Sequence, residues 1–63
     1  MKVYVVDDNV YIDKIFSTFE AAEQYVMDTY NVIPMYDYDG YITYGKEDSN
    51  IELFSIEEYE VEE

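Results

Sequence analysis

The shortness of the chain constrains its fold more than any single motif does. Sixty-three residues form one domain at most, and so short a chain buries only about 60% of the surface that its unfolded form exposes. There is no cysteine, so neither a disulfide nor a thiolate metal site can add stability. Stability must therefore come from well-packed secondary structure or from self-association, which leaves a homodimer open.

The clearest local signal in the chain is a helix start at Ser17. Ser17 is a preferred N-cap residue and Glu20 follows three positions later, which is the capping-box pattern. Apolar residues then recur at helical spacing and form one stripe: Phe19, Ala22, Val26 and Tyr30. Asn31 and Pro34 end this pattern, so we expect one helix over residues 18–29.

The segments before this helix indicate two strands joined by a tight turn. Residues 1–6 and 10–16 are rich in β-branched and aromatic side chains, and residues 7–9 between them are Asp-Asp-Asn. We therefore expect a hairpin. Its first strand is the most apolar in the chain, so we expect that strand to be central in the sheet.

A second hairpin is predicted around Asp39-Gly40. This dipeptide separates the tyrosine-rich residues 32–38 and 41–44, which is typical of a two-residue type I′ turn. The turn sets the register of three cross-strand pairs: Tyr38 with Tyr41, Asp37 with Ile42, and Tyr36 with Thr43. Pro34 indicates that the first arm starts irregularly or lies at an edge of the sheet.

The rest of the chain completes an α+β fold. Residues 45–50 form a polar loop, and residues 51–61 are extended, with a change of apolar parity that predicts a bulge or a split near Ser55. One helix that covers one face of an antiparallel sheet of about four or five strands would bury both apolar surfaces. We therefore predict a single small acidic domain over residues 1–63.

Four segments carry a resemblance to known proteins: residues 2–6, 16–18, 22–25 and 56–60. They resemble a set of small, largely uncharacterised phage and Firmicute proteins. Those proteins open with a Lys-Val-Tyr-Val-like strand, enter a helix through Phe-Ser-Thr and close on an acidic strand similar to Ile-Glu-Glu-Tyr-Glu. The resemblance implies a sheet-plus-helix fold and a phage or mobile-element setting, and it implies no activity. Residues 36–44 depart from the pattern, so we expect a function peculiar to this protein to reside there.

The charge of the chain decides which partners it can approach. Sixteen Asp and Glu residues face three Lys, and the net charge is −13. Nucleic acid and anionic membrane surfaces would repel such a protein. No apolar run reaches the roughly 18–20 residues of a membrane span. The absence of cysteine and of a signal segment leads us to expect a cytoplasmic protein of the host cell.

The residues that most enzymes rely on are missing. The chain has no His and no Cys, no glycine-rich phosphate loop, and no base placed in sequence to activate its serines. We therefore predict no catalytic residue, no cofactor and no enzymatic activity. Residues 37–40 look like part of a calcium loop, but the pattern would put Met35 and Lys46 at ligand positions, so no metal site is predicted.

The acidic residues suggest a mimic of nucleic acid. On a strand, Glu58, Glu60 and Glu62 would project from one face about 6.7 Å apart, and phosphates along a DNA strand rise by about 3.4 Å. Four further acids would extend the row: Asp7, Asp8, Asp37 and Asp39. A groove built for nucleic acid would attract such a row. The simpler interpretation is that the acids confer solubility, for which a charge of about 2–8 suffices.

These features predict an inhibitor that binds a basic, nucleic-acid-handling host protein. A CRISPR effector, a restriction enzyme, a DNA-repair glycosylase and a polymerase belong to that class, and an anti-CRISPR or other anti-defence role is the leading hypothesis. The seven acids would make the contact, with three tyrosines as anchors: Tyr36, Tyr38 and Tyr41. Two alternatives stay open. One is a non-catalytic assembly module that self-associates through a sheet edge or the tyrosine hairpin, and the other is a small acidic metal-binding protein.

Overall fold

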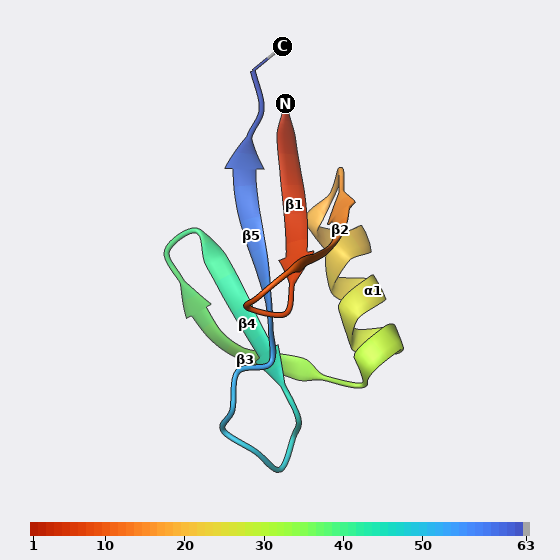
Figure 1. The fold of residues 1–63 in the computed structure, drawn as a ribbon, viewed down its shortest axis with the longest axis vertical. Coiled ribbons are helices and arrows are strands. Elements are labelled where there is room, and N and C mark those ends of the chain that lie inside the picture. The colour runs from red at the N-terminus through yellow and green to blue at the C-terminus, as the bar shows by residue number, and fades with distance from the viewer. Residues whose placement is uncertain (63) are drawn as a thin grey trace.

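A five-stranded antiparallel sheet carries one helix in the computed structural model, which describes residues 1–62 (Figure 1). In chain order the elements are β1 (Lys2–Asp7), β2 (Ile12–Phe16), α1 (Phe19–Tyr30), β3 (Ile33–Tyr38), β4 (Tyr41–Gly45) and β5 (Phe54–Glu60). The strand order across the sheet is β2-β1-β5-β4-β3. The predicted α+β class and both predicted hairpins are confirmed.

The middle strand of the sheet is β5, whereas β1, which was predicted to be central, lies beside it as an interior strand paired with β2 and β5. β5 pairs with β1 along one edge and with β4 along the other, and neither ladder shifts register. The predicted bulge or split near Ser55 is therefore wrong, because β5 runs without interruption from Phe54 to Glu60. Ile51 and Leu53, which suggested it, precede the strand and belong to the loop. The register shifts lie instead in the two outer ladders, between Val6 and Asp7 in β1–β2 and between Pro34 and Tyr36 in β3–β4.

The helix begins one residue later than its capping box predicts. Thr18 is the N-cap, with extended backbone, and its side-chain oxygen accepts a hydrogen bond from the Ala21 N–H at 3.2 Å. Glu20 is then too close to the cap for the reciprocal bond of a capping box, and Ser17 lies outside the helix. The end at Asn31 is confirmed: this residue takes the left-handed conformation at φ 55°, and its N–H bonds to the Met27 carbonyl.

The tyrosine hairpin has the predicted register but a different turn. All three predicted cross-strand pairs are formed. In the described chain Asn9 and Asn31 are the non-glycine residues with positive φ, and Gly40 has φ 95°. Asp39 therefore lacks the positive φ that a type I′ turn needs at its first central position, so that prediction is wrong.

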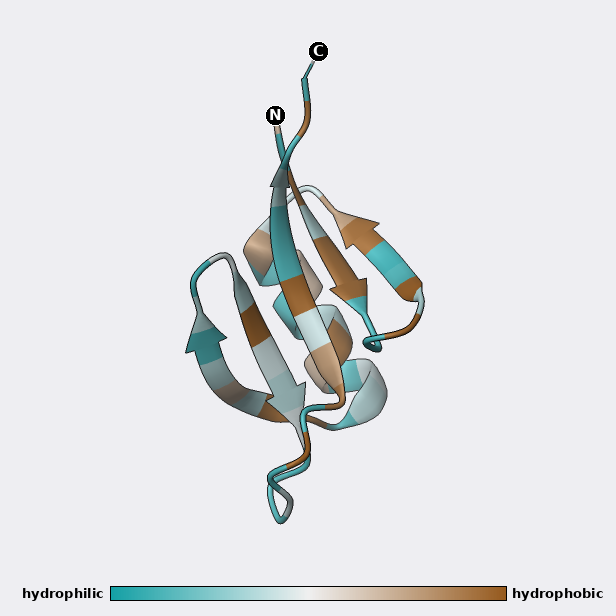
Figure 2. Cartoon of the chain, turned by 60° about the vertical axis from the view of Figure 1, so that its left-hand side comes forward, coloured by the Kyte–Doolittle hydropathy of each residue, from teal (hydrophilic) through white to brown (hydrophobic). Residues whose placement is uncertain are grey.

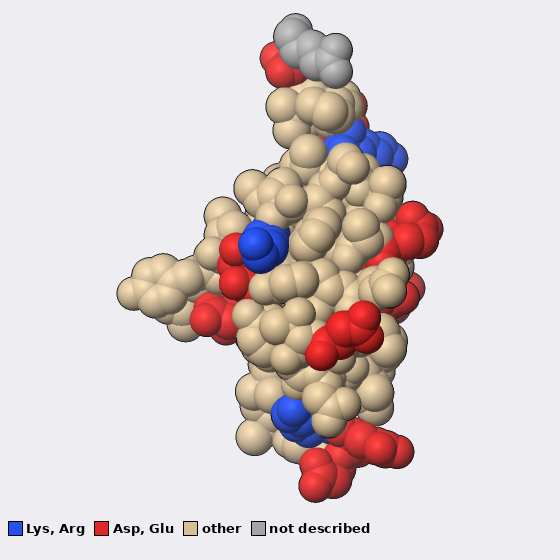
Figure 3. All heavy atoms as spheres, turned by 90° about the vertical axis from the view of Figure 1, so that its right-hand side faces the viewer, with Lys and Arg blue, Asp and Glu red and all other residues tan. Residues whose placement is uncertain are grey.

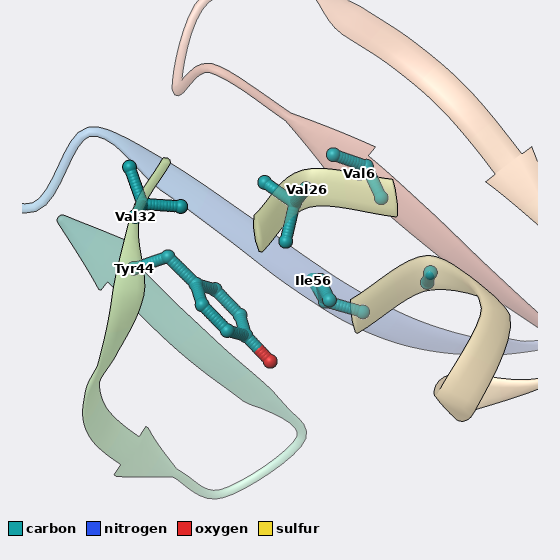
Figure 4. Packing of buried hydrophobic residues seen from close by; sticks show 6 residues of the cluster. Val6, Val26, Val32, Tyr44 and Ile56 are labelled. Carbon is teal, nitrogen blue, oxygen red and sulfur yellow. The ribbon is translucent and has the colours of Figure 1, made fainter. Parts of the chain in front are cut away.

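The core lies between the helix and one face of the sheet, which we call the helix face (Figure 4). Buried apolar side chains meet there from three strands, the helix and the connection to β3: Val6, Ala22, Val26, Val32, Tyr44 and Ile56. Figure 2 shows apolar segments on neighbouring strands with the helix behind them. The predicted helical stripe is thus confirmed, with Ala22 and Val26 fully buried and Phe19 and Tyr30 partly so.

The helix packs chiefly on β1, β2 and β5 and leaves the β3–β4 hairpin to one side (Figure 1). Tyr44 of β4 extends from the hairpin toward the helix. Its ring is fully buried in the core, and its hydroxyl donates a hydrogen bond to Glu23 Oε2 of the helix at 2.7 Å. Burial and this bond raise the pKa of the Tyr44 phenol, so it stays a neutral donor.

A lysine from the β4–β5 loop closes the C-terminal end of the helix. Lys46 Nζ donates hydrogen bonds to the Tyr30 carbonyl at 2.6 Å and to the Asn31 carbonyl at 3.3 Å. The last carbonyls of a helix lack intrahelical partners and carry partial negative charge, so a cation there is favourable. No basic residue lies in the last turn of the helix itself, which leaves this role to Lys46.

We predict that Lys46→Met lowers the free energy of unfolding by about 1 kcal/mol, because the helix end loses both its donor and its cation. Urea unfolding followed by circular dichroism measures this. Lys2→Met is the matched control, since it changes the net charge equally but breaks only the exposed 3.4 Å ion pair with Glu58. Equal destabilisation by the two substitutions would contradict the proposed role of Lys46.

Candidate binding surface

The sheet divides the predicted contact residues between its two faces. Side chains alternate along a strand, and Asp37 lies in one cross-strand row with Ile42, Ile56 and Val6, which face the helix. Tyr36, one residue earlier, pairs with Thr43 on the opposite face, which we call the open face. Asp37 therefore points to the helix face and Tyr36 to the open face, and the two sets of predicted contact residues meet again only at the turn between β3 and β4.

The three predicted tyrosine anchors gather on the open face. Tyr36, Tyr38 and Tyr41 are 38–50% exposed. The rings of Tyr38 and Tyr41 are stacked at 4.8 Å between centroids, and Tyr36 lies 6.1 Å from Tyr38. The Tyr38 hydroxyl donates a 2.8 Å hydrogen bond to Glu52, and this bond raises the pKa of Tyr38. The row is thus a fixed aromatic surface beside an accepting carboxylate.

Half of the predicted contact residues line one hollow of about 290 Å³ at the β3–β4 turn. These are Asp37, Tyr38, Asp39, Tyr41 and Glu58. Its other lining residues are apolar, aromatic or glycine: Tyr4, Phe19, Gly40, Ile42 and Ile56. We call this site the hairpin hollow. It combines three carboxylates with an apolar and aromatic wall, a combination that suits a cationic side chain.

Two contacts build the hairpin hollow. The Glu58 N–H donates to the Gly40 carbonyl at 3.2 Å, which brings the acidic β5 strand beside the β3–β4 turn. Tyr4 and Phe19 meet edge to face at 6.1 Å between ring centroids where the helix begins, and both line the hollow. The apolar lining residues could have been found from the strand parity that predicts Tyr4 and Ile56 as core-facing.

The predicted acids do not form one continuous row. Glu58 and Glu60 alternate on β5 as expected, but Glu58 pairs with Lys2 at 3.4 Å and Glu60 with the terminal ammonium group at 3.3 Å. Glu62 lies beyond the end of β5. On the face shown in Figure 3, acidic side chains form separate groups along the molecule.

Asp7 and Asp8 lie at the β1–β2 turn, away from the hairpin hollow. Asp8 Oδ1 accepts hydrogen bonds from the N–H groups of Tyr11 at 2.7 Å and Val10 at 3.0 Å, and these bonds lower the pKa of Asp8. Burial raises the pKa of Asp7, and the neighbouring charges of Glu57 and Asp8 act in the same direction. The ionised carboxylate of Asp8 thus stabilises the turn, whereas ionisation of Asp7 destabilises the folded state.

Tyrosine hydroxyls, and not lysines, satisfy several carboxylates. Tyr25 and Tyr30 both donate to Asp13 Oδ2, at 2.8 and 2.7 Å, and the bonds from Tyr30 and then Tyr25 lower the pKa of Asp13. Tyr59 donates to Glu57 at 2.6 Å on the open face. The helical stripe predicts packing for Tyr30, but nothing in the sequence points to Asp13, because the register shift that leaves Asp13 unpaired between Ile12 and Lys14 has no local signal.

Within residues 1–62 no group of three or more His, Cys, Asp or Glu side chains is placed to hold a metal ion. The same residues include no helix that is long and apolar enough to cross a membrane. Comparison of the chain with protein-family models, with curated proteins and with solved structures finds no match. The resemblance to phage and Firmicute proteins therefore stays a prediction.

We predict opposite effects of Asp7→Asn and Asp8→Asn at pH 7, although both remove one negative charge. The folded-state pKa of Asp7 is raised, so its ionisation costs stability above that pKa, and Asp7→Asn should raise the unfolding temperature. The pKa of Asp8 is lowered, so its contribution is present above the ordinary value of 3.8 and is lost as the pH falls. Asp8→Asn should therefore lower the unfolding temperature.

Both differences from the wild type should shrink as the pH falls through the respective carboxyl pKa values, because the wild-type groups then become neutral. Thermal unfolding followed by circular dichroism between pH 7 and pH 3 measures them. If both variants change the unfolding temperature in the same direction at pH 7, the loss of one negative charge, and not the local contacts of each aspartate, accounts for the effect.

Proposed function

We propose that this protein binds a basic, nucleic-acid-handling protein of a bacterial host and blocks its nucleic-acid site. The setting we propose is a phage or mobile element acting in the host cytoplasm. An anti-defence role is the leading case, with a CRISPR effector as the first target class to test. The net charge of −13 supports this choice of partner, because association with a cationic groove is accelerated and association with nucleic acid is opposed.

The hairpin hollow carries the proposal. Arginine pairs with carboxylates through a planar fork and also stacks on aromatic faces, and lysine offers a compact cation to the same groups. Asp37 and Asp39 supply two carboxylates, and Glu58 supplies a third that already forms an exposed ion pair with Lys2 at 3.4 Å. Tyr4 and Phe19 supply the aromatic wall. Proteins that hold nucleic acid expose Arg and Lys for phosphate contacts. If the hollow binds such an Arg or Lys side chain, it competes with a nucleic-acid phosphate for that side chain.

The mimicry that we propose is therefore local. Because Glu58 and Glu60 are paired with cations and Asp7 lies in a different hollow, the protein would replace a few phosphates at the hairpin hollow and would not copy a length of DNA backbone. The exposed tyrosine row on the open face lies on the same β3–β4 hairpin. It offers a contact area for protein surface next to the charged contact.

The alternative function is an assembly module that self-associates. Its support is that β2 and β3 are the outer strands of the sheet and that three tyrosines are exposed on β3 and β4. Repulsion between two copies of net charge −13 opposes it. We predict a monomer near 7.5 kDa by size-exclusion chromatography with light scattering. A tight oligomer in which the tyrosines become inaccessible would favour the alternative.

We predict that charge removal at the hairpin hollow abolishes partner capture. The test variant is Asp37→Asn/Asp39→Asn/Glu58→Gln. Immobilised wild-type protein is incubated with host lysate at low salt and eluted with a gradient from about 50 to about 200 mM salt. Retained proteins should be basic, should elute within that range and should be released by duplex DNA. The hollow variant should retain them at least about tenfold less.

The matched control is Asp28→Asn/Glu47→Gln/Asp48→Asn. It also removes two Asp charges and one Glu charge, all from exposed residues that do not line the hairpin hollow. This control variant should retain the same proteins as the wild type. Equal losses in both variants would indicate that total charge alone governs capture, and retention that neither salt nor DNA affects would contradict the proposal.

A further inference from the structure

The β1–β2 connection presents three consecutive large apolar side chains to solvent. Val10 and Tyr11 are each 75% exposed and Ile12 is 65% exposed. Single exposed apolar residues are ordinary on protein surfaces, whereas adjacent ones form a continuous apolar surface of the kind that interaction sites use. We call residues 10–12 the apolar turn. The predicted function does not use them.

The apolar turn is fixed before any partner arrives. Asp8 Oδ1 accepts from the Val10 and Tyr11 N–H groups, and the Asp8 N–H donates to the Tyr11 carbonyl at 3.2 Å. Asn9 takes φ 75°, donates through Nδ2 to the Glu52 carbonyl at 3.0 Å, and accepts from Ser55 Oγ at 3.0 Å. A partner would not have to order this loop on binding, which removes a usual cost of association.

A hollow of about 300 Å³ lies beside the apolar turn and carries two carboxylates. Asp7 and Glu57 line it together with Asn9 and the three apolar residues. The charges of the two acids repel each other, although Asp7 Oδ1 accepts a hydrogen bond from the Asn9 N–H at 3.0 Å and Glu57 accepts one from the Tyr59 hydroxyl at 2.6 Å. A cation placed between Asp7 and Glu57 would relieve that repulsion. We call this site the turn hollow; it shares no lining residue with the hairpin hollow.

We propose that the apolar turn and the turn hollow together bind a protein segment in which a Lys or Arg stands next to apolar side chains. The cationic group enters the turn hollow between Asp7 and Glu57, and its apolar neighbours cover Val10, Tyr11 and Ile12. This inference extends the proposed function by adding a second contact. It rests only on the partner being a basic protein and not on its handling of nucleic acid.

Charge selects this occupant over two others. A second copy of the chain would bring another net charge of −13 to a patch that lies beside Asp7 and Glu57 and whose backbone amides are bonded to Asp8. An anionic membrane would be repelled by the same carboxylates. A cationic, partly apolar protein segment would cover the exposed apolar side chains and place its positive charge beside Asp7 and Glu57.

The test uses a library of random 12-residue peptides displayed on phage and selected on the wild-type protein at about 150 mM NaCl, where distant charges are screened. Selected peptides should combine at least one Lys or Arg with nearby apolar or aromatic residues. Tyr11→Ser/Ile12→Ser and Asp7→Asn/Glu57→Gln should each weaken a selected synthetic peptide at least about tenfold. The hairpin-hollow variant Asp37→Asn/Asp39→Asn/Glu58→Gln should change its Kd less than about twofold.

The outcomes separate this inference from the proposed function. Loss of peptide binding in the hairpin-hollow variant alone would overturn the inference and leave the hairpin hollow as the binding site. No selected sequence, sequences without a cation or without apolar residues, or unchanged binding by the Tyr11→Ser/Ile12→Ser variant would also overturn it. Unfolding temperatures verify that the variants fold, and Tyr11→Ser alone, at a 75% exposed residue, serves if a double variant does not.

Discussion

The hydroxyl of Tyr44 holds the two parts of this small fold together. The helix packs chiefly on β1, β2 and β5, so few side chains join it to the β3–β4 hairpin besides Tyr44 and, just after β4, Lys46. The Tyr44 ring fills the core between them, and its hydrogen bond to Glu23 ties β4 to the helix. A buried polar group is favourable only when it is paired, and this one is. The hairpin that carries the proposed binding surface is thus tied to the helix through β4.

The sequence predicts the parts of this fold that follow from local chemistry. Helical spacing located α1, and Asp39-Gly40 fixed the register of the second hairpin. The errors arose where tertiary pairing decides. The acidic β5 is the middle strand because it pairs with both β1 and β4. Pairing between strands that are distant in the chain cannot be predicted from a local sequence pattern. Ser17 and Thr18 are both good caps, so one residue could not be preferred over the other from sequence.

The candidate site shows the same division. Strand alternation correctly placed Glu58 and Glu60 on one side of β5, yet their pairing with Lys2 and the terminal ammonium group depends on the antiparallel β1–β5 ladder. The hairpin hollow joins Asp37 and Asp39 to Glu58 across β4, and the turn hollow joins Asp7 to Glu57 across the β1–β5 ladder. The residue types were therefore sufficient to predict an anionic surface. The order of the strands in the sheet, which the sequence did not reveal, separates these acids into two hollows.

The tyrosines resolve an apparent conflict in a protein with so many acids and so few bases. The carboxylates of Asp13, Glu23, Glu52 and Glu57 accept hydrogen bonds from phenols. A lysine in any of these places would cancel the charge that it stabilises, whereas an uncharged donor anchors the carboxylate and leaves its field intact. The carboxylates of such a molecule can be well ordered while the molecule keeps its net negative charge. Its long-range attraction for cations is undiminished by the bonds that hold it in shape.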